Sequence, residues 1–447
     1  NLQPDAVTYG AAVSACGRSW RWETSIHLLD EMGCSQLGPN LIACSAAISA
    51  CGHGQQWPWA LWLLAYAVQI CLALDVIAYN AAITACEKGQ QWERALSVLG
   101  VAQLRSLAAS AVTFAAAISA CEKGKQWQKA LSLLAEALAS GIAVDLVICN
   151  AAISACGEGL RWDIALQLFS SLPLWHVRPD LVSFNSVISA CEKGHNWQAA
   201  LLMLWTLPKS GFQPNVISYN AAISACEKAE KLGEVYGLLQ DMHHHSVQPT
   251  LITFNATMSA HERVHLWEHV LQWWKELHAE GFTPSSISYS VAVRACASGQ
   301  QWERLMHFLE ELQTANIESP QSASEAYFLG LAGLVNAGEM AAALALFRDG
   351  LAAGLLKDPW VGPNELDLHG LKGAADARLV VSAALLAPGT GRRRSPERTL
   401  VIVTGWGAHS EELGEPHLRP AVLALLREDL QLEAYVHTSN QGRVCLP

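Results

Sequence analysis

The chain has 447 residues, more than one compact core normally holds, so several domains or a repeat array are expected. Hydrophobic residues make up 51% and charged residues only 15%, a composition that suits packed short helices and excludes disorder. The formal net charge of -11 excludes nucleic-acid binding through overall electrostatics and leaves only a local stripe. Thirteen cysteines in a chain of this size, with no recognisable secretory signal, favour reduced thiols over a disulfide framework.

Tryptophan recurs at intervals of 35 residues or a multiple of 35. The residues in this phase are Trp22, Trp57, Trp92, Trp127, Trp162, Trp197, Trp267 and Trp302, with Leu232 in the one remaining place. Cysteine follows the same period at Cys16, Cys51, Cys86, Cys121, Cys156, Cys191, Cys226 and Cys296, with His261 replacing one. A fixed period of this length is the signature of a repeat array. Counted from Ala6, it predicts nine units: 6–40, 41–75, 76–110, 111–145, 146–180, 181–215, 216–250, 251–285 and 286–320.

Each unit is predicted to be a helical hairpin. In residues 76–110, the run IAYNAAITACEKG indicates a first helix, and QWERALSVL opens a second. Neither helix can bury its apolar face alone, so the hairpins are expected to stack into an all-α solenoid, a superhelix with a long concave surface. Residues 57–74 are apolar enough for a membrane span, but Pro58 and the continuing period favour a repeat helix, and no membrane contact is expected.

The rest of the chain departs from the period. Residues 321–360 are expected to form a degenerate repeat or capping helices, with a tenth hairpin over 322–356. Residues 361–447 alternate strand and helix patterns and predict a small α/β domain. The predicted fold class is therefore a helical-hairpin solenoid followed by a small α/β C-terminal domain.

The unit VxYNAAISACEKGxQWxxAL, clearest at 216–228 and 76–96, resembles the pentatricopeptide repeat across residues 6–320. Its period of 35 separates it from the 34-residue tetratricopeptide repeat. The resemblance implies that the chain binds single-stranded RNA as a monomer, with one base for each repeat. It also implies residence in an organelle, either chloroplast or mitochondrion, and a role in RNA processing, stabilisation or expression.

The resemblance assigns a base-sandwiching role to a β-branched aliphatic residue near the start of each first helix. These residues are Val7, Ile42, Ile77, Val112, Val147, Val182, Ile217, Ile252 and Ile287. The alternative is that a valine or isoleucine at this position packs in the core of the solenoid.

The resemblance assigns base edges to two polar residues of each repeat: the one three positions after the aliphatic residue, and the last residue. The pairs are Ser45 with Asp75, Asn80 with Ser110, Asn150 with Asp180, Asn185 with Asn215, Asn220 with Thr250, and Asn255 with Ser285. Ionised aspartate only accepts hydrogen bonds and suits uracil or guanine, whereas Ser, Thr or Asn can donate to cytosine. The family code then implies 5′-G-C-N-U-Y-Y-C-3′ for repeats two to eight. Gly10, Ala115 and Pro320 depart from the pattern in repeats one, four and nine.

Basic residues recur near the end of the first helices, where they could follow the phosphates of a bound strand. They are Arg18, Lys88, Lys123, Lys193, Lys228 and Arg263. They are explained equally well as solvated residues at helix ends, where a cation interacts favourably with the helix dipole. The tryptophans are expected to pack between repeats rather than to stack on bases. His243, His244 and His245, with His261, His265 and His269 downstream, are expected in solvated turns rather than at a metal site.

The C-terminal region carries three ordered motifs: LDLHG at 366–370, TGWGAHS at 404–410, and Asn440 with Gly442. They resemble a small MutS-related (Smr) domain, a family that binds nucleic acid and in part cleaves it. By this resemblance Asp367, His369 and His409 are the candidate catalytic residues, with a divalent cation such as Mg²⁺ only if the domain is a nuclease. Otherwise no cofactor is expected. An RNA endonuclease and a protein-binding scaffold remain the alternatives to an RNA-binding protein.

Overall fold

The computed structural model describes residues 5–352, apart from residues 20, 36, 71, 73, 106, 108, 315–319, 337 and 339. Further along the chain it describes residues 360–362, 365–368, 377, 380–381, 400–404, 418–429, 431, 433–436 and 443–446. The chain forms two compact units, Asn1–Gln248 and Pro249–Pro447.

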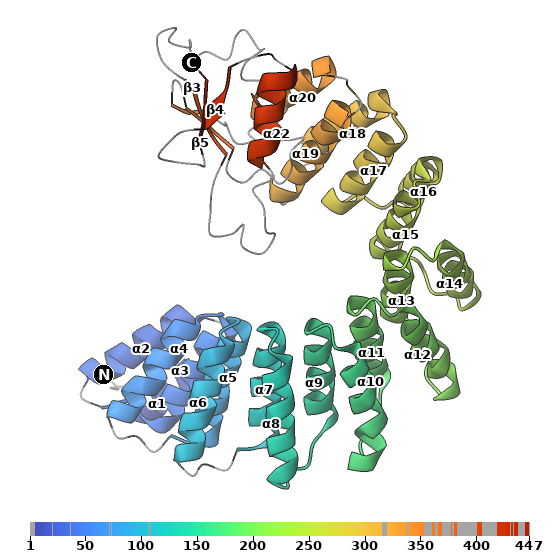
Figure 1. Ribbon diagram of the computed structural model, residues 1–447. Coiled ribbons are helices and arrows are strands. Elements are labelled where there is room, and N and C mark those ends of the chain that lie inside the picture. Colours follow the sequence, from blue (N-terminus) through green and yellow to red (C-terminus); the bar gives the residue numbers. More distant parts are fainter. Residues whose placement is uncertain are drawn as a thin grey trace. The chain divides into compact units, whose positions relative to one another are not determined.

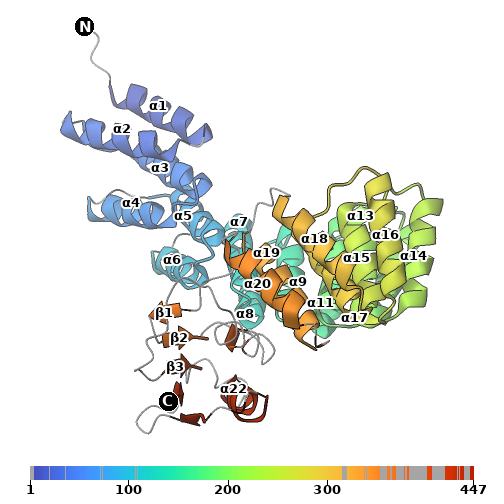
Figure 2. The ribbon, with the colours of Figure 1, turned by 90° about the horizontal axis from the view of Figure 1, so that it is seen from above.

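The first unit consists of helical hairpins that follow one another along the chain (Figure 1). Its first helices are α1 (Ala6–Arg18), α3 (Leu41–His53), α5 (Val76–Lys88), α7 (Ala111–Lys123), α9 (Leu146–Glu158), α11 (Leu181–Lys193) and α13 (Val216–Lys228). Its second helices are α2 (Trp22–Cys34), α4 (Trp57–Gln69), α6 (Trp92–Leu104), α8 (Trp127–Ala139), α10 (Trp162–Ser171) with the 3-10 turn η1 (Leu172–Trp175), α12 (Trp197–Lys209) and α14 (Leu232–His244). Each first helix packs against its own second helix and against the first helices of neighbouring repeats (Figure 2).

The core of the first unit is built from small and β-branched residues that return at the same place in successive first helices. Fully buried isoleucines at Ile48, Ile83, Ile118, Ile153, Ile188 and Ile223 form one row of it. The cysteines form another: Cys51, Cys86, Cys121, Cys156, Cys191 and Cys226 are buried and free of disulfides. Burial raises the pKa of Cys191 to about 12, so this thiol stays protonated and behaves as a small hydrophobic side chain.

The tryptophan that opens each of α2, α4, α6, α8 and α10 packs against the next repeat, as predicted from the sequence. A Cβ placed on the glycine that ends the following first helix would overlap the tryptophan ring. This holds for Gly54 with Trp22, Gly89 with Trp57, Gly124 with Trp92, Gly159 with Trp127, and Gly194 with Trp162. The rings are half-buried, and cations cover some of them, such as Arg94 at 4.8 Å from the Trp57 centroid. At these five positions the glycine therefore leaves room for the tryptophan ring of the preceding repeat.

The second unit begins with further hairpins and ends in a sheet. Its helices are α15 (Leu251–Arg263), α16 (Trp267–Ala279), α17 (Ser286–Ser298), α18 (Trp302–Thr314), α19 (Pro320–Asn336) and α20 (Met340–Ala352). The C-terminal elements are β1 (Trp360–Gly362), β2 (Glu365–Asp367), β3 (Leu400–Val403), α22 (Leu418–Ala424) with the π-helical turn η2 (Leu425–Asp429), β4 (Tyr435–Val436) and β5 (Arg443–Leu446). One connected hydrophobic core extends from Phe254 in α15 to Leu446 in β5.

The strands form one sheet in the order β1-β2-β3-β5-β4, and Figure 2 shows β1, β2 and β3 side by side. β2 and β3 are parallel, and the other neighbours are antiparallel. The predicted fold class, a helical solenoid followed by a small region with strands, is confirmed. Strand β1 was not predicted. None of the described helices has the length and hydrophobicity needed to cross a bilayer.

Candidate binding surface on the first helices

The second residue of every first helix is an exposed β-branched aliphatic. These nine residues, called the aliphatic row here, are Val7, Ile42, Ile77, Val112, Val147, Val182, Ile217, Ile252 and Ile287. Their exposed fractions run from 56% at Val182 to 75% at Val7. Single exposed apolar residues are ordinary, but a row that keeps one register position through nine helices is not scatter. The core-packing alternative for these residues is therefore wrong.

The repeat-final residues are the N-caps of the next first helix. Asn40, Asp75, Ser110, Asp145, Asp180, Asn215 and Ser285 each accept a hydrogen bond from the backbone N–H three residues further on. The distance is 2.8 Å from Ala43 N to Asn40 Oδ1, and 3.0 Å from Ser218 N to Asn215 Oδ1. Such caps contribute about 1 kcal/mol each. This second role was not predicted from the sequence, although Ser, Asp and Asn before an apolar helix are its usual signal.

In at least three repeats a hydroxyl of the following repeat connects the two polar residues assigned to base edges. Asn80 Oδ1 accepts a hydrogen bond from Thr113 Oγ1 at 2.7 Å. Thr113 Oγ1 also contacts the hydroxyl of Ser110, the other residue of this pair. Asn185 Oδ1 accepts from Ser218 Oγ at 2.6 Å, and Asn185 Nδ2 donates to Asn215 Oδ1 at 3.4 Å.

The third such repeat repeats this geometry. Asn255 Oδ1 accepts from Ser288 Oγ at 2.6 Å, and Asn255 Nδ2 donates to Ser285 Oγ at 3.3 Å. The structure thus brings two of these predicted pairs into direct contact and links Asn80 to Ser110 through Thr113. It adds hydroxyl residues that were not singled out from the sequence.

The pair of Asn150 and Asp180 is arranged differently. Ser183 donates both its backbone N–H, at 2.8 Å, and its hydroxyl, at 2.9 Å, to Asp180 Oδ1. Burial raises the pKa of Asp180, but the hydrogen bonds from Ser183 and Asn150 outweigh it and lower the pKa overall. Asp180 is therefore ionised and accepts only. Asn150 Oδ1 is buried without a hydrogen-bond partner in the described part of the chain.

Ser45, which is paired with Asp75 in the prediction, makes no such side-chain hydrogen bond within the described part of the chain. Its Oγ is buried and has no partner among the described residues. The third residue of the following helix is Ala78, which has no hydroxyl to offer. Within the first unit, the polar pairs therefore differ in how far they are preorganised.

The basic residues near the ends of the first helices form ion pairs between repeats. Lys123 lies 2.9 Å from Glu87, Lys193 lies 2.7 Å from Glu158, and Lys228 lies 2.9 Å from Glu192. Lys88 Nζ lies 3.1 Å from His53 Nδ1. The side chain of Arg18 lies outside the described part, and Arg263 has an interaction partner of its own. A lysine that is already paired offers little net charge to a phosphate, so these contacts favour a structural role.

The histidines are split between two environments. His243, His244 and His245 are exposed at the end of α14. His261 is fully buried, its Nδ1 lies 2.7 Å from the Thr257 carbonyl oxygen, and its ring stacks on His269 at 5.6 Å. The described residues contain no group of three potential metal ligands.

The C-terminal sheet places one of the three predicted catalytic residues. Asp367 is half-buried at the end of β2, paired in register with Val403 of β3. His369 and His409 lie outside the described residues. A metal site would need ligands beyond Asp367, and the described residues group no two further potential ligands with it.

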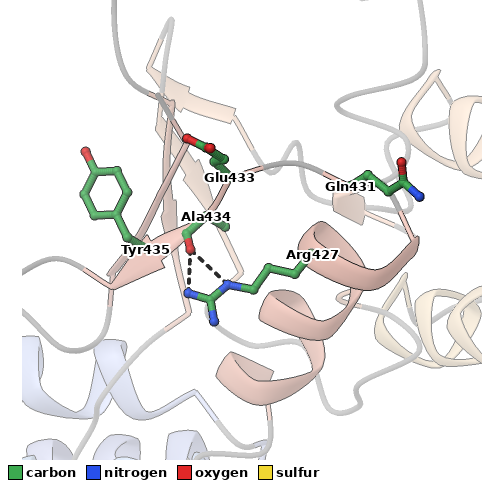
Figure 3. Close-up of a pocket in the computed structure, with 5 residues that line it drawn as sticks. All are labelled: Arg427, Gln431, Glu433, Ala434 and Tyr435. Atoms are coloured by element: carbon green, nitrogen blue, oxygen red, sulfur yellow. Dashed lines mark hydrogen bonds between the residues drawn. The ribbon is translucent and has the colours of Figure 1, made fainter.

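A pocket beside α22 contains none of the predicted catalytic residues. Figure 3 shows its lining residues Arg427, Gln431, Glu433, Ala434 and Tyr435. The guanidinium group of Arg427 already has a partner within the protein: Nε and Nη2 donate to the Ala434 carbonyl oxygen at 3.0 and 2.6 Å. This contact ties α22 and η2 to the segment before β4, so we assign it a structural role.

The hairpins of 35 residues, with the aliphatic row at one position of every first helix, define a helical-repeat protein. Residues 132–193 and 204–263 match the model of the pentatricopeptide repeat domain, and residues 7–37, 112–142 and 182–212 match that of the single PPR repeat. The chain therefore contains pentatricopeptide repeats.

One solved structure shows a similar fold. The crystal structure of the pentatricopeptide repeat protein PPR10 from maize is similar with a TM-score of 0.56 and 19% identity, over 84% of this chain and 56% of that one. This chain thus spans about half the length of the maize structure. PPR10 in complex with an 18-nt psaJ RNA element gives a TM-score of 0.43 at 20% identity, over 86% and 57% of the two chains. Among curated proteins, none matches the sequence.

Proposed function

We propose that this chain binds single-stranded RNA sequence-selectively, with one base held by each repeat. The aliphatic row carries the proposal. Its nine exposed β-branched side chains occupy the same position in each first helix, three residues before the position that the resemblance assigns to a base edge. Exposed aliphatic groups bury favourably against the faces of unstacked bases, and the polar groups beside them can reach the base edges. PPR10, whose fold this chain shares, has been solved with an RNA element.

The polar pairs supply the selectivity in this proposal. The ionised Asp180 with Asn150 suits uracil, because uracil offers an imino N–H to a carboxylate. Asn80 with Ser110 and Asn255 with Ser285 suit cytosine, and Ser45 with Asp75 suits guanine. Asn185 with Asn215, and Asn220 with Thr250, favour pyrimidines. The expected core for repeats two to eight remains 5′-G-C-N-U-Y-Y-C-3′.

The charge distribution shapes how this binding would work. The net charge is -11, and Lys123, Lys193 and Lys228 are paired with glutamates. Affinity is then expected to come chiefly from contacts with base faces and base edges, because these three lysines are already compensated by glutamates and would release few counterions from phosphates. We therefore expect a shallow dependence of affinity on salt.

Selection from a randomised RNA pool tests the proposal. The full chain is incubated with single-stranded RNA at physiological salt, and the retained RNA is sequenced. Enrichment of a core similar to G-C-N-U-Y-Y-C supports both the register and the function. A matched variant, Asp180→Ser, should change the base preferred at the fourth position of this core from uracil to cytosine and leave the others. Retained RNA with the same base frequencies as the input pool would contradict the proposal and favour a protein-binding scaffold.

For residues 361–447 we infer a second nucleic-acid contact, as the resemblance to the Smr domain implies. Asp367 supports it, because it stands at the carboxyl end of β2 beside the parallel strand β3, the edge where such sheets hold ligands. Cleavage of the selected RNA by the full chain, lost in His369→Ala with binding retained, would establish the endonuclease alternative; equal cleavage by both would reject the assignment of His369. Organellar residence is inferred from the family resemblance, and tagging the full-length gene product tests it.

A further inference from the structure

Three hydroxyl groups lie where neighbouring repeats meet on the proposed RNA-binding surface. Thr113, Ser218 and Ser288 are each the third residue of a first helix, and all three are buried, with exposed fractions of 1%, 0% and 0%. Each contacts the asparagine of the preceding repeat that belongs to the base-edge set, across a separation of 33 residues. The same hydroxyl oxygen accepts the backbone N–H of its own N-cap residue, at 3.0 Å, 3.3 Å and 3.0 Å respectively.

The distances show where each hydroxyl proton goes. Ser218 Oγ lies 2.6 Å from Asn185 Oδ1 but 3.0 Å from Asn215 Oδ1. Ser288 Oγ lies 2.6 Å from Asn255 Oδ1 but 3.1 Å from Ser285 Oγ. A hydroxyl has one hydrogen, and the shorter contact is the stronger one, so the proton is donated to the asparagine oxygen.

This donation fixes the direction of the asparagine amide. With Oδ1 held by the hydroxyl, Nδ2 is turned toward the repeat-final residue, 3.4 Å from Asn215 Oδ1 in one repeat and 3.3 Å from Ser285 Oγ in another. The amide nitrogen carries two hydrogens, so one remains to donate to an acceptor on a base edge. In the opposite orientation the asparagine would offer an acceptor to the base and give up its shortest hydrogen bond.

We propose that Thr113, Ser218 and Ser288 are positioning residues that set the base preference of the preceding repeat by holding Asn80, Asn185 and Asn255 as hydrogen-bond donors. The proposal rests on the RNA-binding function proposed above. It places part of the specificity of one repeat in the next repeat, at a residue that does not touch the base itself.

The chain contains a natural contrast. Ser183 stands at the same position, but its hydroxyl is donated to the carboxylate of Asp180, and Asn150 Oδ1 has no partner in the described part of the chain. The charged acceptor draws the hydroxyl away, because hydrogen bonds to an ionised group are the stronger ones. Asn150 is then oriented by its own hydrogen bond to Asp180, and not by the hydroxyl contact that holds Asn185. An aspartate N-cap therefore changes the base preference of its repeat in two ways, directly and through the neighbouring asparagine.

The test uses Ser218→Ala in the full chain and the RNA core selected by the wild type. Affinity is measured for four RNAs that differ only at the base paired with Asn185. The preference for pyrimidines at this position should fall about two- to tenfold, the value of one net hydrogen bond, while preferences at the other positions stay the same. Ser218→Thr keeps the hydroxyl and should restore the preference.

Control variants separate positioning from folding. Thr8→Ala removes a hydroxyl at the same register position, which donates to its N-cap Asp5 and contacts no asparagine among the described residues, and it should change no base preference. If Ser218→Ala does not fold, Thr113→Val, which keeps the β-branched shape, carries the same test for the base paired with Asn80. A uniform loss of affinity for all four RNAs, or an unchanged preference, would overturn the positioning role. Absence of any base preference in the wild type would instead overturn the proposed function.

Discussion

Replacing Ile217 by alanine separates the two roles that an aliphatic residue can have in this fold. Ile217 belongs to the aliphatic row and is 63% exposed, whereas Ile223 of the same helix, α13, is fully buried. Complete burial of such a side chain is worth about 1.5 to 3 kcal/mol. In the free protein only about a third of the Ile217 side chain is buried, so it contributes only about a third of this free energy. Ile217→Ala should therefore lower the free energy of unfolding by less than ~1 kcal/mol.

The remaining surface of Ile217 becomes buried only when a base covers it. By the same measure this burial is worth about 1 to 2 kcal/mol, which corresponds to a five- to thirtyfold weaker affinity of Ile217→Ala for the selected RNA. Ile223→Ala should show the opposite pattern: a loss of about 2 to 5 kcal/mol in stability from the cavity it leaves, and an RNA affinity close to wild type wherever the variant is folded.

Urea denaturation gives the two stabilities, and fluorescence anisotropy with labelled RNA gives the two affinities. The decisive quantity is the ratio of lost affinity to lost stability, which should be high for Ile217→Ala and low for Ile223→Ala. If Ile217→Ala binds the selected RNA as tightly as the wild type, the aliphatic row does not contact bases.

Three further predictions follow from the geometry. Leu160 is 60% exposed and has a left-handed backbone with φ of 58°, so Leu160→Gly should raise the free energy of unfolding by about 1 kcal/mol in urea titrations. Burial lowers the pKa of His261 below 6.5, so the stability of the fold should fall as the pH drops below this value, because the unfolded chain then binds the proton more readily. His261→Cys should remove this loss of stability in thermal melts. Equal pH profiles of the variant and the wild type would contradict this prediction. Lys228→Gln should leave the salt dependence of RNA binding unchanged, because Lys228 is paired with Glu192; a slope smaller by about 0.7 would show that it contacts a phosphate.

The period of the sequence was enough to predict the hairpins, because tryptophan and cysteine mark the same place in every repeat. The direction of the aliphatic row could not be predicted, since a valine or isoleucine satisfies both a core and an exposed position of a helix start. The ion pairs followed more directly from the sequence: Glu87 and Glu192, which each precede a lysine in an EKG segment, lie beside Lys123 and Lys228 of the next repeat once the hairpins stack. Period alone, however, does not say which neighbour a side chain faces.

The hydroxyls at Thr113, Ser218 and Ser288 show where sequence reasoning ends for the site. Their contacts with asparagines 33 residues earlier depend on the stacking of two first helices and on competition with the N-cap acceptor. That competition is decided by tenths of an ångström and by the charge of the cap residue. In the C-terminal region the strand β1 was missed because its three residues, WVG, carry no alternating pattern.

The N-cap role of the repeat-final residue limits which bases such an array can be evolved or designed to select. Asn, Asp, Ser and Thr are the side chains that cap a helix well, and the repeat-final residues Asn40 to Ser285 are drawn from this set alone. Replacing one member by another changes the hydrogen bonds offered to a base while keeping the cap. Replacing it by a residue outside the set would cost about 1 kcal/mol for each helix, a loss that accumulates along a stack in which every repeat supports the next. Stability and base selection are thus linked through one side chain, and this link explains why the residue proposed to vary with the base varies only among good caps.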